Sequence, residues 1–342
     1  MKNLVTLTIL ALIILSCQPK TSRQLDTILL ASMGNKYKTD YETAIQNFKQ
    51  EIKADSTNLN AWVGLGETEI ILFLFGYTSR SETVPIAEQC LIQAHNIDSL
   101  DAGTLKLSGL VKFLDWNWEA ARQDFLASIA TNPSDLSTRH WYSLWLVTMG
   151  RIDEALVQHD TITSLDTNED FLVGRGSIYY FLRDNKALEK LMLKTIAKDP
   201  ASPWPYDWLG MAYIEQKDYK NSLDTYFKAF ELSDGTVEVG AGLGHALGFA
   251  GEYELAKQMA DYYEEAAKTA YLPQMQRAFI HIGIGEHEKA IDLLEEAYDQ
   301  KSWFLIFMGV EPWLDPLREM DRFKKLKAKM NYPDWNSKSS ID

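Results

Sequence analysis

The chain has few of the residues from which disulfides and metal sites are built. Only two of its 342 residues are cysteine and six are histidine. There is no CxxC pair, and no histidine forms an i, i+4 pair with a carboxylate in the arrangement of a zinc site. An intrachain disulfide is not expected, and Cys90 is interpreted as a small buried apolar residue. The sequence predicts no metal and no cofactor.

Motifs that carry catalysis are also missing. No nucleophile elbow, catalytic triad or paired carboxylates can be recognised. The stretch GAGLGHALGFAG at 240–251 superficially resembles a phosphate-binding loop, but it lacks the Lys-Ser/Thr pair and the strand that normally precedes it. We therefore expect a protein that is not an enzyme.

Positive charge is scarce as well. The chain carries 34 basic and 48 acidic residues, for a net charge of −14. An acidic surface repels nucleic-acid phosphates and anionic lipid headgroups, so nucleic-acid binding is not expected. Any attachment to a membrane must then depend on a dedicated anchor.

The apolar run at the start of the chain is short. It spans twelve residues, 4–15, which is less than the ~20 needed to cross a bilayer. With Lys2 before it and Ile-Leu-Ser-Cys at its end, residues 1–16 are interpreted as a secretory signal peptide, and the end resembles a bacterial lipobox. We expect cleavage before Cys17, a diacylglycerol on its sulfur, and a tether at 17–24. That predicts an exported protein, lipid-anchored at the bacterial cell envelope. The alternatives are an ordinary signal peptide with a coincidental cysteine, or an uncleaved anchor helix.

What the sequence does contain is a repeat. The stretch DWNWEAARQDFLASIATNP at 115–133 places Trp118, Ala121, Phe125 and Ser128 on one face of a helix. The marker position of Ala121 recurs with spacings of 43, 34, 34, 33, 34, 34 and 34 residues. The eight markers are Ala44, Ala87, Ala121, Ala155, Leu188, Ser222, Ala256 and Ala290. A fixed period of this length is typical of repeat proteins, in which each unit buries its apolar face against its neighbours.

The period and the match in YDWLGMAYIEQKDYKNSLDTYFKAFELS resemble the tetratricopeptide repeat. The resemblance implies an all-α fold, a superhelical solenoid of about eight helix–turn–helix units. We expect the array at 25–304, with repeats starting near 25, 59, 102, 136, 169, 203, 237 and 271. A capping helix within 305–335 is expected to cover the last repeat, and 336–342 to be a loose tail.

Repeat two is longer than the others by nine residues. The apolar run 70–75 predicts a lengthened first helix, and 76–84 a longer loop. The apolar residues are interpreted either as padding of the core or as an exposed ledge for a partner or the membrane surface.

Three stretches also resemble a bacterial repeat module that is usually fused to transcription regulators, cyclases or kinases: DWNWEAARQDF, RHWYSLWLVTMGRIDEAL and WLDPLREMDRFKKLKAKM. The family usually reads Asp-Pro-Arg-Phe near its end, whereas residues 320–323 here lack the proline. Because a lipobox stands where those relatives carry an effector domain, their DNA-binding and catalytic roles are not expected. What the resemblance still implies is a module that contacts proteins or small ligands.

In tetratricopeptide repeats the first helix of each unit lines a concave groove. The resemblance places these residues there: Lys106, Leu110, Phe113, His140, Leu144, Val147, Val173, Ser177, Tyr180, Trp204, Asp207, Met211, Ile214, His245, Phe249, Met275 and Phe279. An apolar, aromatic groove suits a peptide segment or an amphipathic helix. The alternative is that these residues pack against neighbouring repeats of the superhelix or against the C-terminal cap. We therefore expect a non-catalytic protein–protein interaction scaffold that holds another protein or a peptide segment. The alternative is a module that binds or senses a small extracytoplasmic ligand, a peptide or glycan, on its tryptophans.

Overall fold

The computed structural model describes residues 36–166 and 171–333, and within these ranges all regular structure is helical. The predicted signal peptide, Cys17, the tether and the tail at 336–342 lie outside the described residues. Over the described part of the chain, no helix is both long and apolar enough to cross a bilayer.

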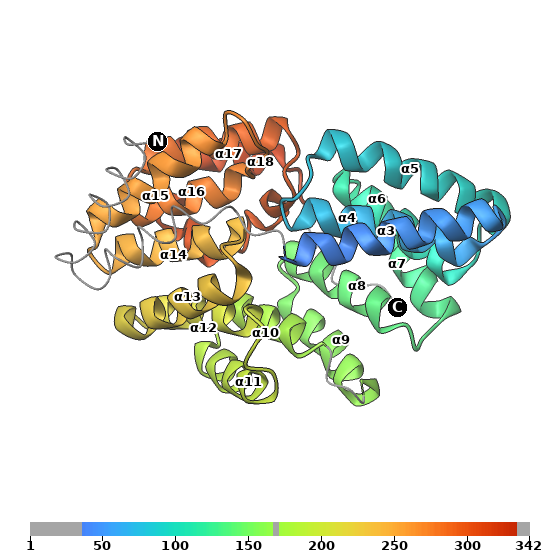
Figure 1. Cartoon of the computed structure of the whole chain (residues 1–342), viewed down its shortest axis with the longest axis horizontal. Helices are drawn as coiled ribbons and strands as arrows, with labels where there is room; N and C mark the ends of the chain where they lie inside the picture. The colour runs from blue at the N-terminus through green and yellow to red at the C-terminus, as the bar shows by residue number, and fades with distance from the viewer. Residues whose placement is uncertain (1–35, 167–170, 334–342) are drawn as a thin grey trace, which may run out of the picture.

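The helices alternate between the inner and outer sides of a superhelix, and the all-α solenoid predicted from the 34-residue period is confirmed (Figure 1). The inner helices, the first of each pair, are α4 (Leu59–Leu74), α6 (Ala102–Leu114), α8 (Leu136–Thr148), α10 (Leu172–Phe181), α12 (Trp204–Glu215), α14 (Val237–Phe249) and α16 (Gln274–Gly283). The outer helices are α3 (Lys36–Ala54), α5 (Arg80–Ile97), α7 (Trp118–Thr131), α9 (Ile152–Leu165), α11 (Asn185–Lys198), α13 (Tyr219–Ser233), α15 (Tyr253–Ala266) and α17 (His287–Asp299). The marker residues from Ala87 to Ala290 lie on outer helices with exposed fractions of 0%.

The insertion in repeat two lengthens helices instead of forming a long loop. The helix α4 continues to Leu74, as predicted, but the loop prediction for 76–84 is wrong, because α5 begins at Arg80. The backbone N–H of Ser79 donates to Glu82 Oε2 at 2.7 Å, a helix-start signal that the sequence analysis missed. Within 70–75, three residues pad the core and three face the interior of the superhelix, so the run is not an outward ledge.

The glycine-rich stretch 240–251 falls mostly within α14, where it allows an unusually close helix contact. A Cβ on Gly248 would lie 2.2 Å from the carbonyl oxygen of Gly283, and one on Gly283 would lie 2.7 Å from that of His245. Backbone therefore meets backbone between α14 and α16. These glycines serve helix packing, which is consistent with the weak phosphate-loop match.

The C-terminal segment, defined here as residues 303–330, covers more than the last repeat. It contains η1 (Trp303–Phe307), η2 (Pro312–Leu317) and α18 (Asp321–Lys329). The helix α18 packs on α17, but η1 also contacts α4 and α8, and η2 contacts α16. The prediction of a cap restricted to the last repeat is therefore too narrow. The reason is that all five residues of WFLIF at 303–307 are apolar, and four of them are buried inside the superhelix.

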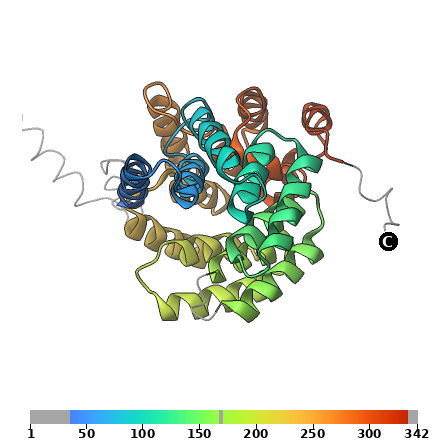
Figure 2. The same ribbon diagram turned by 90° about the vertical axis from the view of Figure 1, so that its right-hand side faces the viewer.

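These contacts close the superhelix into a ring, as Figure 2 shows. At the seam, the rings of Trp116 and Tyr298 lie 5.3 Å apart, and Lys301 Nζ is 3.6 Å from Asp115 Oδ1. The indole N–H of Trp118 donates to the carbonyl oxygen of Met330 at 3.1 Å in a buried position. The third repeat therefore lies beside the last repeat and the C-terminal segment.

Candidate functional site

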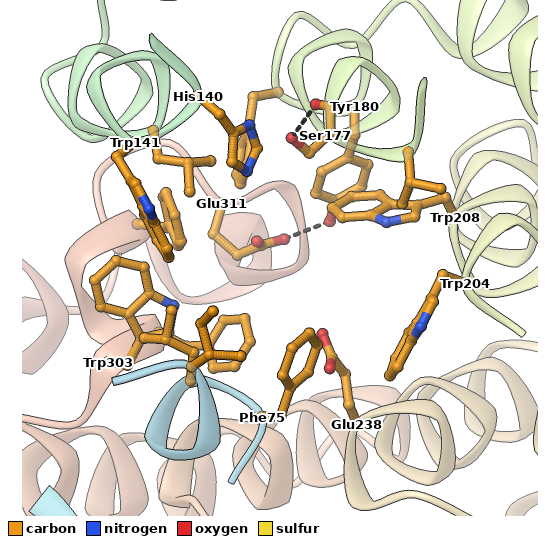
Figure 3. Close-up of a pocket in the computed structure, with 18 of the residues that line it drawn as sticks. Phe75, His140, Trp141, Ser177, Tyr180, Trp204, Trp208, Glu238, Trp303 and Glu311 are labelled. Atoms are coloured by element: carbon orange, nitrogen blue, oxygen red, sulfur yellow. Dashed lines mark hydrogen bonds between the residues drawn. The ribbon is translucent and has the colours of Figure 1, made fainter. Parts of the chain in front are cut away.

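The interior of the ring contains a cavity of about 450 Å³. This volume lies in the range of small-molecule sites. The side chains that line it come from inner helices, from the start of α3, and from the C-terminal segment (Figure 3). Twelve of them are aromatic: Tyr41, Phe75, Trp141, Tyr180, Phe181, Trp204, Trp208, Phe279, Trp303, Phe304, Phe307 and Trp313.

The structure brings some predicted groove residues together in this cavity and separates others from it. Lining the cavity are His140, Leu144, Val173, Ser177, Tyr180, Trp204, Met211 and Phe279. Outside it are Lys106, Leu110, Phe113, Val147, Asp207, Ile214, His245, Phe249 and Met275.

The excluded residues are mostly covered by the C-terminal segment or by their own repeats. The ring of Trp303 meets that of Phe113 edge-on at 5.4 Å, and Trp313 stacks on His245 at 4.1 Å. Asp207 and Leu110 are buried, whereas Phe249 is 38% exposed at the edge of α14. The concave face is therefore not an open groove along these positions.

Among the polar lining residues, Glu67 is fully engaged by protein groups. Its carboxylate accepts hydrogen bonds from Ser137 Oγ at 2.9 Å and from Trp141 Nε1 at 3.0 Å. Lys106 Nζ lies 2.7 Å from the other oxygen. This explains where Lys106, predicted to face the groove, is placed: it neutralises Glu67 at one wall of the cavity.

Glu311, which follows η1, reaches into the cavity (Figure 3), and no described lysine or arginine forms an ion pair with its carboxyl group. It accepts a short hydrogen bond from the Tyr180 hydroxyl and one from the backbone N–H of Trp313 at 3.1 Å. Burial raises the pKa of Glu311 to about 7, although both hydrogen bonds oppose the shift. Burial and the neighbouring Glu311 raise the pKa of Tyr180 well above its usual value.

Glu238, in the first turn of α14, is a second carboxyl group at the cavity. Burial and the nearby Asp207 raise its pKa, and burial raises the pKa of Asp207 as well. Glu238 Oε2 and Asp207 Oδ1 are buried without a hydrogen-bond partner in the described part of the chain. Figure 3 shows the Glu238 side chain beside Phe75, pointing into the space that Trp204 and Trp208 also face.

Two further buried polar atoms on the lining residues have no partner among the described groups. They are the acceptor Gln276 Oε1 and the donor Trp313 Nε1, on side chains that are each only 4% exposed. Buried polar groups in proteins are nearly always hydrogen-bonded. These two atoms are closed to water as well, so they are unsatisfied positions in the packing behind the cavity wall.

His140 lines the cavity as a neutral ring. Its Nδ1 lies 3.3 Å from Nε2 of His159 on the neighbouring outer helix, α9. Burial lowers the pKa of His140 to about 4 and, with the adjacent His140 and Arg175, that of His159 to about 2. A neutral histidine pair adds polarity to the wall without adding positive charge.

The described residues contain no group of three His, Cys, Asp or Glu side chains placed to hold a metal ion. Cys90 is buried, and burial raises the pKa of its thiol to about 12. The side chains that line the cavity can enclose a ligand, stack on it and form hydrogen bonds with it. Sequence analysis missed Phe75, Trp141, Trp208, Glu238, Trp303 and Glu311 as cavity residues. The extra apolar run in repeat two was the only signal for Phe75.

No protein-family model matches the sequence. A comparison with curated proteins also finds no match. Among solved structures, the chain is similar to Cut9–Hcn1, a hetero-tetramer of the APC/C, with a TM-score of 0.57 and 15% identity, over 85% of this chain and 52% of that one. It is similar to yeast Tom70 with a TM-score of 0.49 and 15% identity, over 93% of this chain and 68% of that one. A tetratricopeptide repeat protein from Parabacteroides merdae has a TM-score of 0.43 and 15% identity, over 67% of this chain and 92% of that one.

The likeness to the Cut9–Hcn1 structure, together with the helix pairs seen here, identifies the fold. The chain is an all-α superhelix of the tetratricopeptide-repeat type, as the 34-residue period predicted. It spans about half the length of the Cut9 structure that it matches. At 15% identity the likeness does not extend to what those proteins bind.

Proposed function

We propose that this chain is a non-catalytic binding module and that its ligand sits in the central cavity. The observation that carries the proposal is the cavity itself, about 450 Å³ in volume, lined by twelve aromatic side chains with the carboxyl groups of Glu238 and Glu311 among them. Aromatic side chains with a few placed polar groups are the usual composition of a ligand site. No step of bond making or breaking is needed to explain this arrangement.

The ligand is compact. Residues 303–317 lie on the concave side, where a bound helix or long peptide segment would have to lie. The group in the cavity therefore belongs to a small molecule or to one side chain of a protein partner. The tetratricopeptide-type fold supports the second source, an interaction scaffold, because such superhelices present extended surfaces for binding.

Filling the cavity should abolish binding. In Leu144→Trp the larger side chain occupies the space in which a ligand would stack, so the affinity for a neutral aromatic probe, naphthalenemethanol, should fall at least about tenfold. The measurement is a titration of the full-length protein followed by calorimetry. Val157→Trp is the matched control, since Val157 is 59% exposed on the outer helix α9. Saturable one-to-one binding that is unchanged in Leu144→Trp would place the site elsewhere.

We propose further that the chain is anchored in the bacterial cell envelope through Cys17. The short apolar run at 4–15 and the Ile-Leu-Ser-Cys sequence support cleavage before Cys17 and acylation of its sulfur. Stable attachment needs more than one acyl chain, which bacterial lipoproteins usually carry.

Intact-mass analysis of protein made in a bacterial host tests the anchor. We expect a mature chain that begins at Cys17 and carries the mass of its acyl chains, and we expect Cys17→Ser to lose both the acyl mass and the membrane fraction. Cys90→Ala is the control, because Cys90 is buried in the array and should not affect lipidation. A mature chain that begins at any other residue would contradict the proposal.

A further inference from the structure

We infer that the group held in the cavity is an organic ammonium, a protonated primary or secondary amine on an apolar body. This inference rests on the proposed function, because it names the chemistry of the ligand that the cavity takes. It is carried by two observations: the aromatic walls, and the carboxyl groups of Glu238 and Glu311, which form no ion pair with a described lysine or arginine.

The aromatic walls provide electron-rich faces for a cation. In Figure 3 the labelled rings of Trp141, Trp303, Phe75, Trp204 and Trp208 surround the open space from several sides. An ammonium within about 6 Å of such ring faces is attracted by their quadrupoles, most strongly when it is desolvated. An ammonium that stacks between these rings would be partly removed from water.

Two of the three carboxyl groups that line the cavity, those of Glu238 and Glu311, form no ion pair with a described lysine or arginine, and no described lysine or arginine lines the cavity. Lys106 pairs with the third, Glu67, at 2.7 Å. The charge of Arg318 lowers the pKa of Glu311, but its guanidinium bonds to Asp315 at 2.6 Å and to the backbone carbonyl oxygen of Glu311 at 2.9 Å, not to the Glu311 carboxyl group. A bound cation would compensate the charge that Glu238 and Glu311 acquire on ionisation.

The carboxyl groups of Glu238 and Glu311 are hydrogen-bond acceptors at the cavity. A protonated amine offers N–H donors to them, whereas a quaternary ammonium offers none and a hydrocarbon neither donors nor charge. A sugar also offers donors, but its hydroxyl groups would leave the ionised carboxyl groups without a countercharge. The protonated amine fits both the aromatic walls and the carboxyl groups.

The test is calorimetry of the full-length protein with two probes of nearly equal size, phenethylammonium and the neutral 2-phenylethanol. The ammonium should bind at least about tenfold more tightly at pH 8, where charge and hydrogen bonds add to stacking. Equal or tighter binding of the alcohol overturns the inference and leaves the proposed cavity function standing. If neither these probes nor naphthalenemethanol binds in the millimolar range, the inference and the proposed function both fail.

Variants locate the charge that the ammonium recognises. Glu238→Gln and Glu311→Gln should each reduce the affinity for phenethylammonium at least about fivefold, with little effect on 2-phenylethanol. Glu254→Gln is the matched control, because Glu254 occupies the first turn of the outer helix α15 as Glu238 does that of α14. If both cavity variants bind the ammonium as the wild type does, the inference is wrong even where binding itself is confirmed.

The same chemistry can reach the cavity from a free amine or from a lysine side chain of a protein partner. A short peptide, acetyl-Gly-Lys-Gly-amide, is compared with butylamine in the same titration. Tighter binding of the peptide assigns the ammonium to a protein partner, and tighter binding of butylamine assigns it to a small molecule. The absence of peptide and amine binding alike overturns the inference.

Discussion

Replacing Trp303 by alanine is expected to lower the free energy of unfolding by about 3–5 kcal/mol. Trp303 is 6% exposed and lies at the centre of an aromatic cluster, edge-on to Phe113 at 5.4 Å and to Trp141 at 6.4 Å. Its removal leaves a large void between η1, α6 and α8. It also weakens the contacts that hold the C-terminal segment inside the ring, so the loss is expected at the upper end of the range.

Equilibrium unfolding in urea, followed by circular dichroism, measures this change. Tyr253→Ala is the control, because Tyr253 is 59% exposed on α15 and its truncation should change the unfolding free energy by less than about 0.5 kcal/mol. A loss of less than about 1 kcal/mol for Trp303→Ala would mean that the C-terminal segment does not pack where the structure places it.

Replacing Glu311 by glutamine is expected to remove part of the pH dependence of stability. In the folded protein, burial raises the pKa of Glu311 to about 7 from its usual value of 4.5. Between these values the folded protein binds the proton more tightly than the unfolded chain, so stability from this group falls as pH rises. The fall is roughly 3 kcal/mol between pH 4.5 and pH 8, and glutamine, which does not titrate, should not show it.

The measurement is the difference in unfolding free energy between variant and wild type at a series of pH values. We expect this difference to shift in favour of Glu311→Gln by roughly 3 kcal/mol from pH 4.5 to pH 8. Taking the difference cancels the opposite contribution of buried histidines such as His245, whose pKa burial lowers to about 4. The profile of Glu254→Gln should follow the wild type, and a parallel profile for Glu311→Gln would show that Glu311 ionises freely in the folded protein.

The repeat period was enough to predict the array of helix pairs. Each pair packs on its sequence neighbours, so the spacing of small residues such as Ala121 and Ala155 contains that information. Closure of the ring depends instead on contacts such as Trp118 with Met330, which are 212 residues apart. No local spacing encodes such a contact. The only sequence feature that indicates ring closure is the apolar run at 303–307, which is too hydrophobic for a cap that faces solvent.

The cavity was predictable only in part for the same reason. Family positions on inner helices identified Leu144, Tyr180 and Met211, which do line it. The same positions in α6 do not line the cavity, and Phe113 there is covered by Trp303. Glu311 lies outside any repeat, and its role depends on where the C-terminal segment folds back. Residues that reach the cavity only because the ring closes can be predicted from the sequence only if the closure is predicted first.

Carbodiimide cross-linking of the full-length protein tests the closed ring most directly, because this reagent joins only amines and carboxylates that are already in contact. Lys301 Nζ lies 3.6 Å from Asp115 Oδ1 across the seam, and both side chains are accessible to the reagent. The local pair Lys324–Glu319, at 2.8 Å, reports that the reaction works. The account predicts a cross-linked peptide that joins Lys301 to Asp115 and is lost in Lys301→Arg. Recovery of the Lys324–Glu319 product alone, with Lys301 unlinked to the third repeat, would contradict it.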